Sequence, residues 1–304
     1  MNQIVDRRIA TFFWLSLVCC VLVVSADCDN QYQTAIAVKQ EPPKIENVAV
    51  PHGISLEDYW IDADEIRIDD YKLNRKCSKS TDDIFPKCVL EVRDGSKILR
   101  SFESSISIEY GLFPFLGGDR KQLIVHTYTG GAHCCDIYYI FETSPKLRAI
   151  FDGDQFTTDE IGYGIRPVDA DSDGVFEFSL TVMSFDYELG SHAFSPFPAA
   201  VFAYDRKTRR YELANRKYPK IVKARYAEMQ EWEENTFRFT KDQNMKLRVT
   251  MINKLLFFIY SGKEAEGWSM FDESYNQEDK AEIRNKIQRI LEKDPTYRAI
   301  YLQP

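Results

Sequence analysis

The spacing of apolar residues changes near residue 213. From Trp60 to that point the chain contains short segments rich in β-branched and aromatic residues, separated by turn residues, such as "CVLEVRD", "QLIVHTY" and "FEFSLTVMSF". Segments of this kind are typical of β-strands. After Tyr218, apolar residues recur at three- and four-residue spacings, as in "KLRVTMINKLLFFIYSG" and "EDKAEIRNKIQRILEKDP", and this period predicts helices. We therefore predict an α+β protein, with a mainly antiparallel β domain over residues 56–213 and three or four helices over residues 214–304.

A weak internal repeat lies inside the β domain. Residues 116–150 and 171–213 share an acidic glycine turn, a strand, a loop with glycine and histidine, a second strand, a polar turn and a short strand. Aligned in this way, Leu123 matches Phe178, and Tyr139-Ile140-Phe141 matches Phe202-Ala203-Tyr204. Repeated units of this kind stack in propellers and sandwiches. Two visible copies predict either a partial propeller or an irregular β-sandwich.

The N-terminus has the pattern of a secretory signal. Arg7 and Arg8 precede an apolar run over residues 9–24, and the small residues Ser25 and Ala26 suit a signal peptidase. The alternative is an uncleaved anchor, for which the run is barely long enough to cross ~30 Å of hydrocarbon. We predict a signal peptide over residues 1–26, a polar extended lead over residues 27–55, no further membrane span, and a periplasmic or secreted location. No Asn-x-Ser/Thr sequon occurs, which fits bacterial export.

The charge of the chain argues against nucleic acid as a partner. The whole chain has 39 basic and 47 acidic side chains. Removal of residues 1–26 takes away two arginines and one aspartate, which leaves 37 basic and 46 acidic side chains and a formal charge of −9. Binding to nucleic acid depends on clustered Lys and Arg that displace counterions, and no basic patch is visible in the sequence.

Five cysteines follow the predicted cleavage point, and thiols usually pair in an oxidising compartment. Cys77 and Cys88 enclose a short polar loop, so we predict a disulfide between them. Cys134 and Cys135 are adjacent in "TYTGGAHCCD" and leave several interpretations open. They form a vicinal disulfide, or one of them bridges to Cys28. Otherwise one is a catalytic thiolate with a histidine base, or both bind a transition metal. The catalytic interpretation makes His126 or His133 the base.

The most specific motif is "VDADSDGVFEF". Asp169, Asp171 and Asp173 alternate, a glycine follows, and Glu177 stands eight residues after the first aspartate. Alternate carboxylates on a tight loop can converge on one hard cation when a glycine lets the loop bend. Since the last acid comes at the ninth position of the loop, the motif differs from an EF-hand, which has it at the twelfth. Asp152 and Asp154, in "FDGDQFTTDE", form a weaker candidate for a second ion.

This loop resembles the Asp-x-Asp-x-Asp-Gly-x-x-Asp/Glu loop of integrin α-subunit blades and of the related FG-GAP and VCBS repeats. The resemblance implies calcium at a turn between two strands, held by the side chains of Asp169, Asp171, Asp173 and Glu177 and the main chain of Val175. It also implies a structural ion. The turn "FLGGDRKQL" of the earlier repeat lacks the alternating carboxylates.

Together these patterns predict an exported, calcium-stabilised β-repeat module that recognises a protein or glycan partner in the cell envelope. The alternative is a thiol-dependent redox protein or a hydrolase that uses Cys134 and Cys135. Rapid alkylation of either cysteine in the native protein would favour the enzyme.

Overall fold

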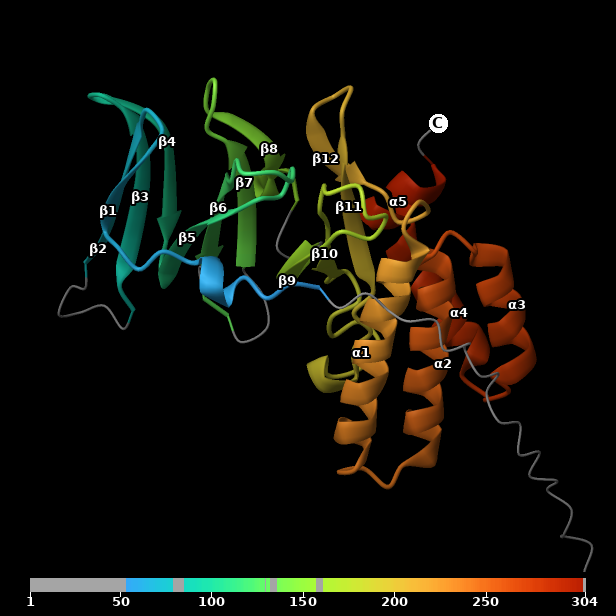
Figure 1. Cartoon of the computed structure of the whole chain (residues 1–304). Coiled ribbons are helices and arrows are strands. Elements are labelled where there is room, and N and C mark those ends of the chain that lie inside the picture. The colour runs from blue at the N-terminus through green and yellow to red at the C-terminus, as the bar shows by residue number, and fades with distance from the viewer. Residues whose placement is uncertain (1–52, 79–84, 129, 132–135, 157–160, 303–304) are drawn as a thin grey trace, which may run out of the picture. The chain divides into compact units, whose positions relative to one another are not determined.

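The computed structural model describes residues 53–78, 85–128, 130–131, 136–156 and 161–302 (Figure 1). The predicted signal peptide, nearly all of the predicted lead, and Cys28, Cys134 and Cys135 lie outside these residues. In the described part of the chain, no helix combines the length and the apolar character that a membrane span requires.

Within the described residues, the β domain contains three four-stranded antiparallel sheets, each made of strands that are consecutive in sequence. The first sheet contains β1 (Glu65–Ile68), β2 (Tyr71–Ser78), β3 (Lys87–Asp94) and β4 (Lys97–Ser104). The second contains β5 (Ser107–Phe113), β6 (Gln122–Tyr128), β7 (Asp136–Glu142) and β8 (Arg148–Asp152). The third contains β9 (Ile161–Val168), β10 (Glu177–Val182), β11 (Ala199–Asp205) and β12 (Arg210–Leu213). Short 3-10 helices are η1 (Glu57–Tyr59), η2 (Gly153–Gln155) and η3 (His192–Phe194).

The second sheet is buried on both faces. Successive side chains of a strand point to opposite faces, so neighbouring residues of β6 serve different cores. Leu123 and Val125 pack in a cluster with the first sheet, which includes Leu73 and Leu90. Ile124, between them, packs in the larger cluster that contains the third sheet and the helices. The buried middle sheet explains why "QLIVHTY" has more consecutive apolar residues than a half-exposed strand would have.

The internal repeat corresponds to the second and third sheets. Leu123 lies on β6 and Phe178 on β10, and each of these strands is the second of its sheet. The predicted match between β7 and β11 is displaced by two residues, because Leu123 pairs with Phe141 whereas Phe178 pairs with Phe202. The first sheet is a third unit of the same topology, and the segment "YWIDADEIRIDDYKL" contains β1 and the start of β2. Asp69, with φ of 51°, forms the turn between them.

A disulfide links Cys77 and Cys88 in the first sheet, the two positions paired in the sequence analysis. These residues lie directly opposite each other in the antiparallel register of β2 and β3. Cys88 is buried and Cys77 is exposed. The covalent link therefore fixes the ends of two paired strands at the base of the loop between them.

Five helices follow the sheets, one or two more than predicted: α1 (Pro219–Phe237), α2 (Gln243–Tyr260), α3 (Glu264–Ser274), α4 (Lys280–Leu291) and α5 (Pro295–Tyr301). The Asp242 side chain accepts a hydrogen bond from the Met245 amide and caps α2, and Asp294 caps α5 in the same way through the Tyr297 amide. Gly262, which follows α2, adopts the left-handed φ of 81° that favours glycine at this position.

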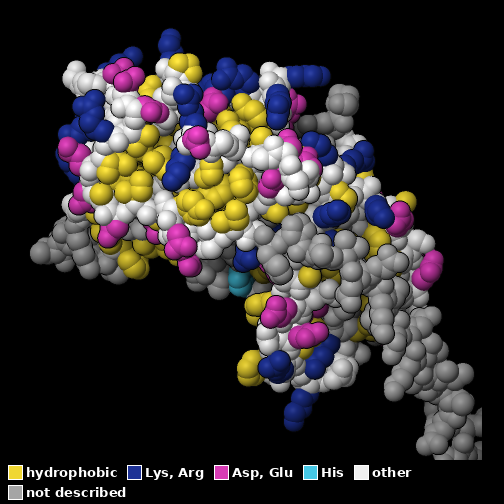
Figure 2. All heavy atoms as spheres, viewed as in Figure 1, with side chains coloured by type: hydrophobic (Ala, Val, Ile, Leu, Met, Phe, Trp, Pro, Cys, Tyr) yellow, Lys and Arg dark blue, Asp and Glu magenta, His cyan; other side chains and the backbone are white. Residues whose placement is uncertain are grey.

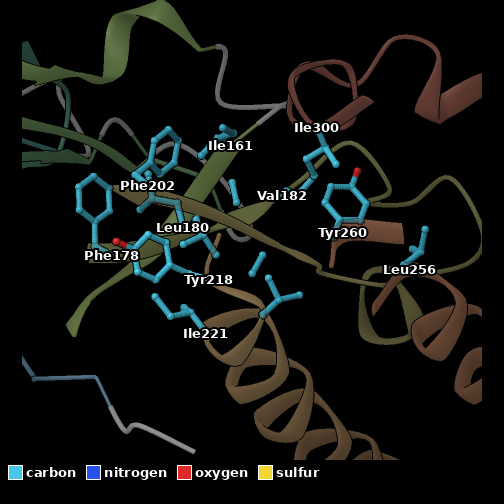
Figure 3. Close-up of a cluster of buried hydrophobic side chains, with 14 of the residues drawn as sticks. Ile161, Phe178, Leu180, Val182, Phe202, Tyr218, Ile221, Leu256, Tyr260 and Ile300 are labelled. Carbon is cyan, nitrogen blue, oxygen red and sulfur yellow. The ribbon is translucent and has the colours of Figure 1, made fainter. Parts of the chain in front are cut away.

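The helices cover the third sheet. α1 contacts β11, and α5 contacts β12. Figure 3 shows Phe178 and Phe202 of the third sheet in one cluster with Ile221 of α1 and with Leu256 and Tyr260 of α2. The apolar face of the helices is thereby buried against the sheet that carries the aspartate loop.

Candidate metal centre

The aspartate loop connects β9 to β10 in the third sheet. Val168 and Glu177 are ladder partners, so the antiparallel pair closes the base of the loop. Ser172 and Gly174 have φ of 60° and 82°. Gly174 adopts this left-handed conformation at little cost because it has no Cβ. These two residues bend the loop so that alternate side chains point toward one place.

Asp169, Asp171 and Asp173 come together as predicted from their spacing. Each offers a carboxylate oxygen that lies within 4.8 Å of those of the other two, and Asp171 and Asp173 are exposed. Asp169 accepts hydrogen bonds from the amides of Asp173 at 3.0 Å and Gly174 at 3.1 Å. Asp173 accepts one from the Val175 amide at 2.8 Å. A carboxylate has about four acceptor positions, so these bonds orient the side chains and leave acceptor capacity for a cation.

Glu177 lies outside the group of three aspartates. Its side chain is buried, with 2% of the residue exposed, and it accepts a hydrogen bond from the Ala170 amide at 3.1 Å. Burial raises the pKa of Glu177, and the charge of Asp171 raises it further. Glu177 therefore holds the backbone of the loop in place at Ala170.

Tyr218, which the sequence analysis did not select, connects Asp171 to Glu177. Its hydroxyl donates a hydrogen bond to Asp171 Oδ2 at 3.0 Å and also bonds to the Glu177 side chain. The residue is buried and precedes α1. Burial raises the pKa of Tyr218, so this hydroxyl stays protonated and can donate. No spacing rule points to it, since it follows Asp171 by 47 residues.

A cation reaches the loop from another turn of the same sheet. The Arg206 guanidinium, after β11, lies 3.5 Å from Asp173 Oδ2, and its side chain is 76% exposed. Exposed ion pairs contribute about 0–1 kcal/mol. Arg206 therefore offsets little of the repulsion among three carboxylates.

The loop packs against the corresponding turn of the second sheet, between β5 and β6. The Phe176 amide donates to the Phe115 carbonyl at 2.8 Å. The buried Tyr211 hydroxyl lies 2.8 Å from the Phe176 carbonyl and 3.3 Å from that of Phe115. Gly117 approaches Gly174 so closely that a Cβ on Gly117 would lie 2.2 Å from the Gly174 carbonyl oxygen. The position of the aspartate loop thus depends on its neighbour.

The two aspartates considered for a second ion both pair with an arginine. Asp152 and Asp154 both pair with Arg100, whose guanidinium lies 3.4 Å and 2.8 Å from their carboxylates. The Tyr139 hydroxyl also donates to Asp154 at 2.5 Å. The positive charge beside these two carboxylates is therefore that of an arginine.

Comparisons of the chain with protein-family models, with curated proteins and with solved structures found no match. The chemistry of the loop rests on its own geometry. Carboxylate and carbonyl oxygens are ligands for hard cations such as Ca²⁺, and a group with two exposed members leaves room for water ligands.

Proposed function

We propose that the loop from Asp169 to Glu177 binds one calcium ion that stabilises the third sheet, as its resemblance to FG-GAP and VCBS loops implies. The observation that carries the proposal is the convergence of the carboxylates of Asp169, Asp171 and Asp173. In this assignment the three aspartates bind directly, the Val175 carbonyl adds a main-chain oxygen, and water completes the shell. The Glu177 carboxylate lies on the buried side of the loop, where it accepts a hydrogen bond from the Ala170 amide.

Charge supports a structural role for the ion. Three carboxylates whose oxygens lie within 4.8 Å of one another repel unless a positive charge lies between them. A calcium ion would remove this repulsion in the folded protein, whereas the unfolded chain has no preformed site. Such binding stabilises the native state by about 2.7 kcal/mol when the free ion is at 100 times its dissociation constant.

We further propose that the protein is an exported binding module for a protein or glycan of the cell envelope. The N-terminal sequence and the calcium-loop resemblance support this proposal. Exposed aromatic side chains, such as Phe85 at 55% and Tyr187 at 59%, offer contact area. Figure 2 shows apolar side chains gathered over the first and second sheets, and exposed apolar patches are typical of interaction sites.

A melting experiment tests the calcium proposal. We expect chelator to lower the melting temperature of the wild-type protein and to leave that of Asp171→Ala unchanged. Asp119→Ala is the matched control, because Asp119 is an exposed aspartate in the corresponding turn of the second sheet. This control should respond to chelator as the wild type does. Equal melting temperatures of the wild type with and without chelator would refute the metal site.

A separate experiment tests the binding module. Cell fractionation should recover the protein outside the cytoplasm with residues 1–26 removed. The purified protein should bind envelope preparations in the presence of calcium. Pretreatment with protease or with glycosidases then assigns the partner as protein or glycan. Recovery in the cytoplasm with an intact N-terminus would contradict the proposal.

A further inference from the structure

A histidine lies between two carboxylates on the second sheet. His126 of β6 has Nδ1 2.9 Å from Glu109 Oε2 and Nε2 2.6 Å from Asp136 Oδ1. Glu109, on β5, is its direct partner in the antiparallel register, and Asp136 begins β7. The imidazole is largely buried, with 12% of its side chain exposed. Three neighbouring strands thus each contribute one titratable group to a single cluster.

The two distances identify the protonation state that fits this cluster. A neutral imidazole has one N–H donor and one lone pair, whereas imidazolium donates from both nitrogens. Both nitrogens of His126 face carboxylates. An ionised carboxylate can accept hydrogen bonds but cannot donate one. Deprotonation would place a lone pair against a carboxylate and remove one of the two bonds. The arrangement is therefore complete when the ring carries both protons.

The surroundings also favour the charged ring. Burial alone lowers the pKa of His126, but the hydrogen bonds and charges of Asp136 and Glu109 outweigh it and raise the pKa above its ordinary value. The hydrogen bond from His126 in turn lowers the pKa of Glu109, despite partial burial. The protonated ring therefore favours the ionised form of Glu109.

The other groups that face the cluster come from β7 itself, from β2 and from the segment before β1. The Tyr138 ring stacks on His126 at 4.6 Å with an interplanar angle of 12°, and its hydroxyl bonds to the backbone of Gly164 and Ile165 in β9. The charge of Arg75, on β2, lowers the pKa of Glu109. Arg75 is itself paired with Asp62 and Asp64. The Trp60 ring lies 6.2 Å from the imidazole. In the described part of the chain, these are the charged, titratable and aromatic neighbours.

We propose that Glu109, His126 and Asp136 form a proton-operated lock that holds β5, β6 and β7 together and opens when His126 loses a proton. The sign follows from the raised pKa of a basic group. The stabilisation is fully present below the unfolded value of about 6.5 and is lost as the pH rises through the higher folded value. Because Tyr138 joins the stacked ring to β9, opening would also loosen the contact between the second and third sheets.

An NMR titration of the full chain after signal removal tests the lock. We expect the ring signal of His126, assigned in the wild type through correlations to its own backbone resonances, to titrate above about pH 6.5. Asp136→Asn removes one negative partner and should move this titration to lower pH. A His126 signal that titrates at or below about pH 6.5 in the wild type would overturn the proposal, whether or not the variants fold.

Stability measurements show whether the protonation of His126 affects the stability of the fold. The urea midpoint of the wild type should fall between about pH 6 and about pH 8, and that of His126→Gln should fall less. His192→Gln is the control, because His192 also contacts a carboxylate, Asp186, through Nδ1 at 2.8 Å, but lies in a loop of the third sheet. The urea midpoint of His192→Gln should fall over this pH range as much as that of the wild type. Equal losses in the wild type and His126→Gln would also overturn the proposal.

Discussion

The contact between the two glycine turns offers a sharp test of the site. Gly117 and Gly118 are consecutive and have nearly the same backbone conformation, with φ of 73° and 70°. A Cβ on Gly117 would lie 2.2 Å from the Gly174 carbonyl oxygen, whereas a Cβ on Gly118 would meet nothing within 4 Å. Substitution by alanine therefore imposes the same backbone cost at both positions and a steric clash at only one.

The expected magnitudes follow from this difference. An L-residue in the left-handed region costs about 1–2 kcal/mol, which is the full expected effect of Gly118→Ala. In Gly117→Ala the two turns must also separate by at least the difference between 2.2 Å and the 3.0 Å limit of real Cβ contacts, or 0.8 Å. This movement strains the Phe176 to Phe115 hydrogen bond and the Tyr211 contacts, each worth about 0.5–1.5 kcal/mol. We expect Gly117→Ala to lose about 2–5 kcal/mol in total.

Urea denaturation of the two variants measures the free energies of unfolding, and calorimetric titration measures their calcium affinities. Displacement of the Gly174 carbonyl should weaken calcium binding in Gly117→Ala, whereas Gly118→Ala should bind as the wild type does. If the two variants lose equal stability and bind calcium equally, the position of the aspartate loop does not depend on the neighbouring turn, and our account of the site is refuted.

Two further predictions concern stability away from the loop. Replacement of both Cys77 and Cys88 by serine opens a link across a sequence separation of 11. It should cost about 2.8 kcal/mol by the loop-entropy relation, measured by urea denaturation with the reduced wild type for comparison. The second concerns Glu233, whose pKa is raised by burial although it bonds to Asn253 and Thr250. Because the folded state holds its proton more tightly than the unfolded state, this residue should lower stability as the pH rises from about 4.5 through the folded pKa. Glu233→Gln should flatten that part of the stability profile, and an unchanged profile would contradict the assignment.

The sequence predicted those features that depend on local spacing. The three apolar positions Ile283, Ile287 and Leu291 are buried on α4. Neighbouring residues of a strand pack on opposite faces of its sheet, as Leu123 and Ile124 of β6 do. The aspartates converge because they lie within five residues of one another and a glycine follows them. In each case the interacting groups are neighbours along the chain, so periodicity and turn chemistry are sufficient.

Features that depend on register or on distant segments were missed. The first sheet was not recognised as a repeat, because the turn at Asp69 has no acidic glycine motif to mark it. Tyr218 and Arg206 reach the loop from other elements. His126 was considered as a base for a thiol, but the pairing of β5, β6 and β7 places carboxylates at both of its nitrogens. Alternation identifies a strand and does not identify its partners.

Because both faces of the second sheet are buried, partial unfolding of the protein would expose an apolar surface. Units that share apolar faces with their neighbours can open one at a time. If the first sheet opened alone, Leu123 and Val125 of β6 would be uncovered together with Tyr139 and Phe141. This surface would accept the first sheet of another molecule as readily as its own, which is the route to domain swapping and aggregation. The Cys77–Cys88 link keeps β2 and β3 joined, so a first sheet that separates from β6 retains this pairing and can return to its own partner.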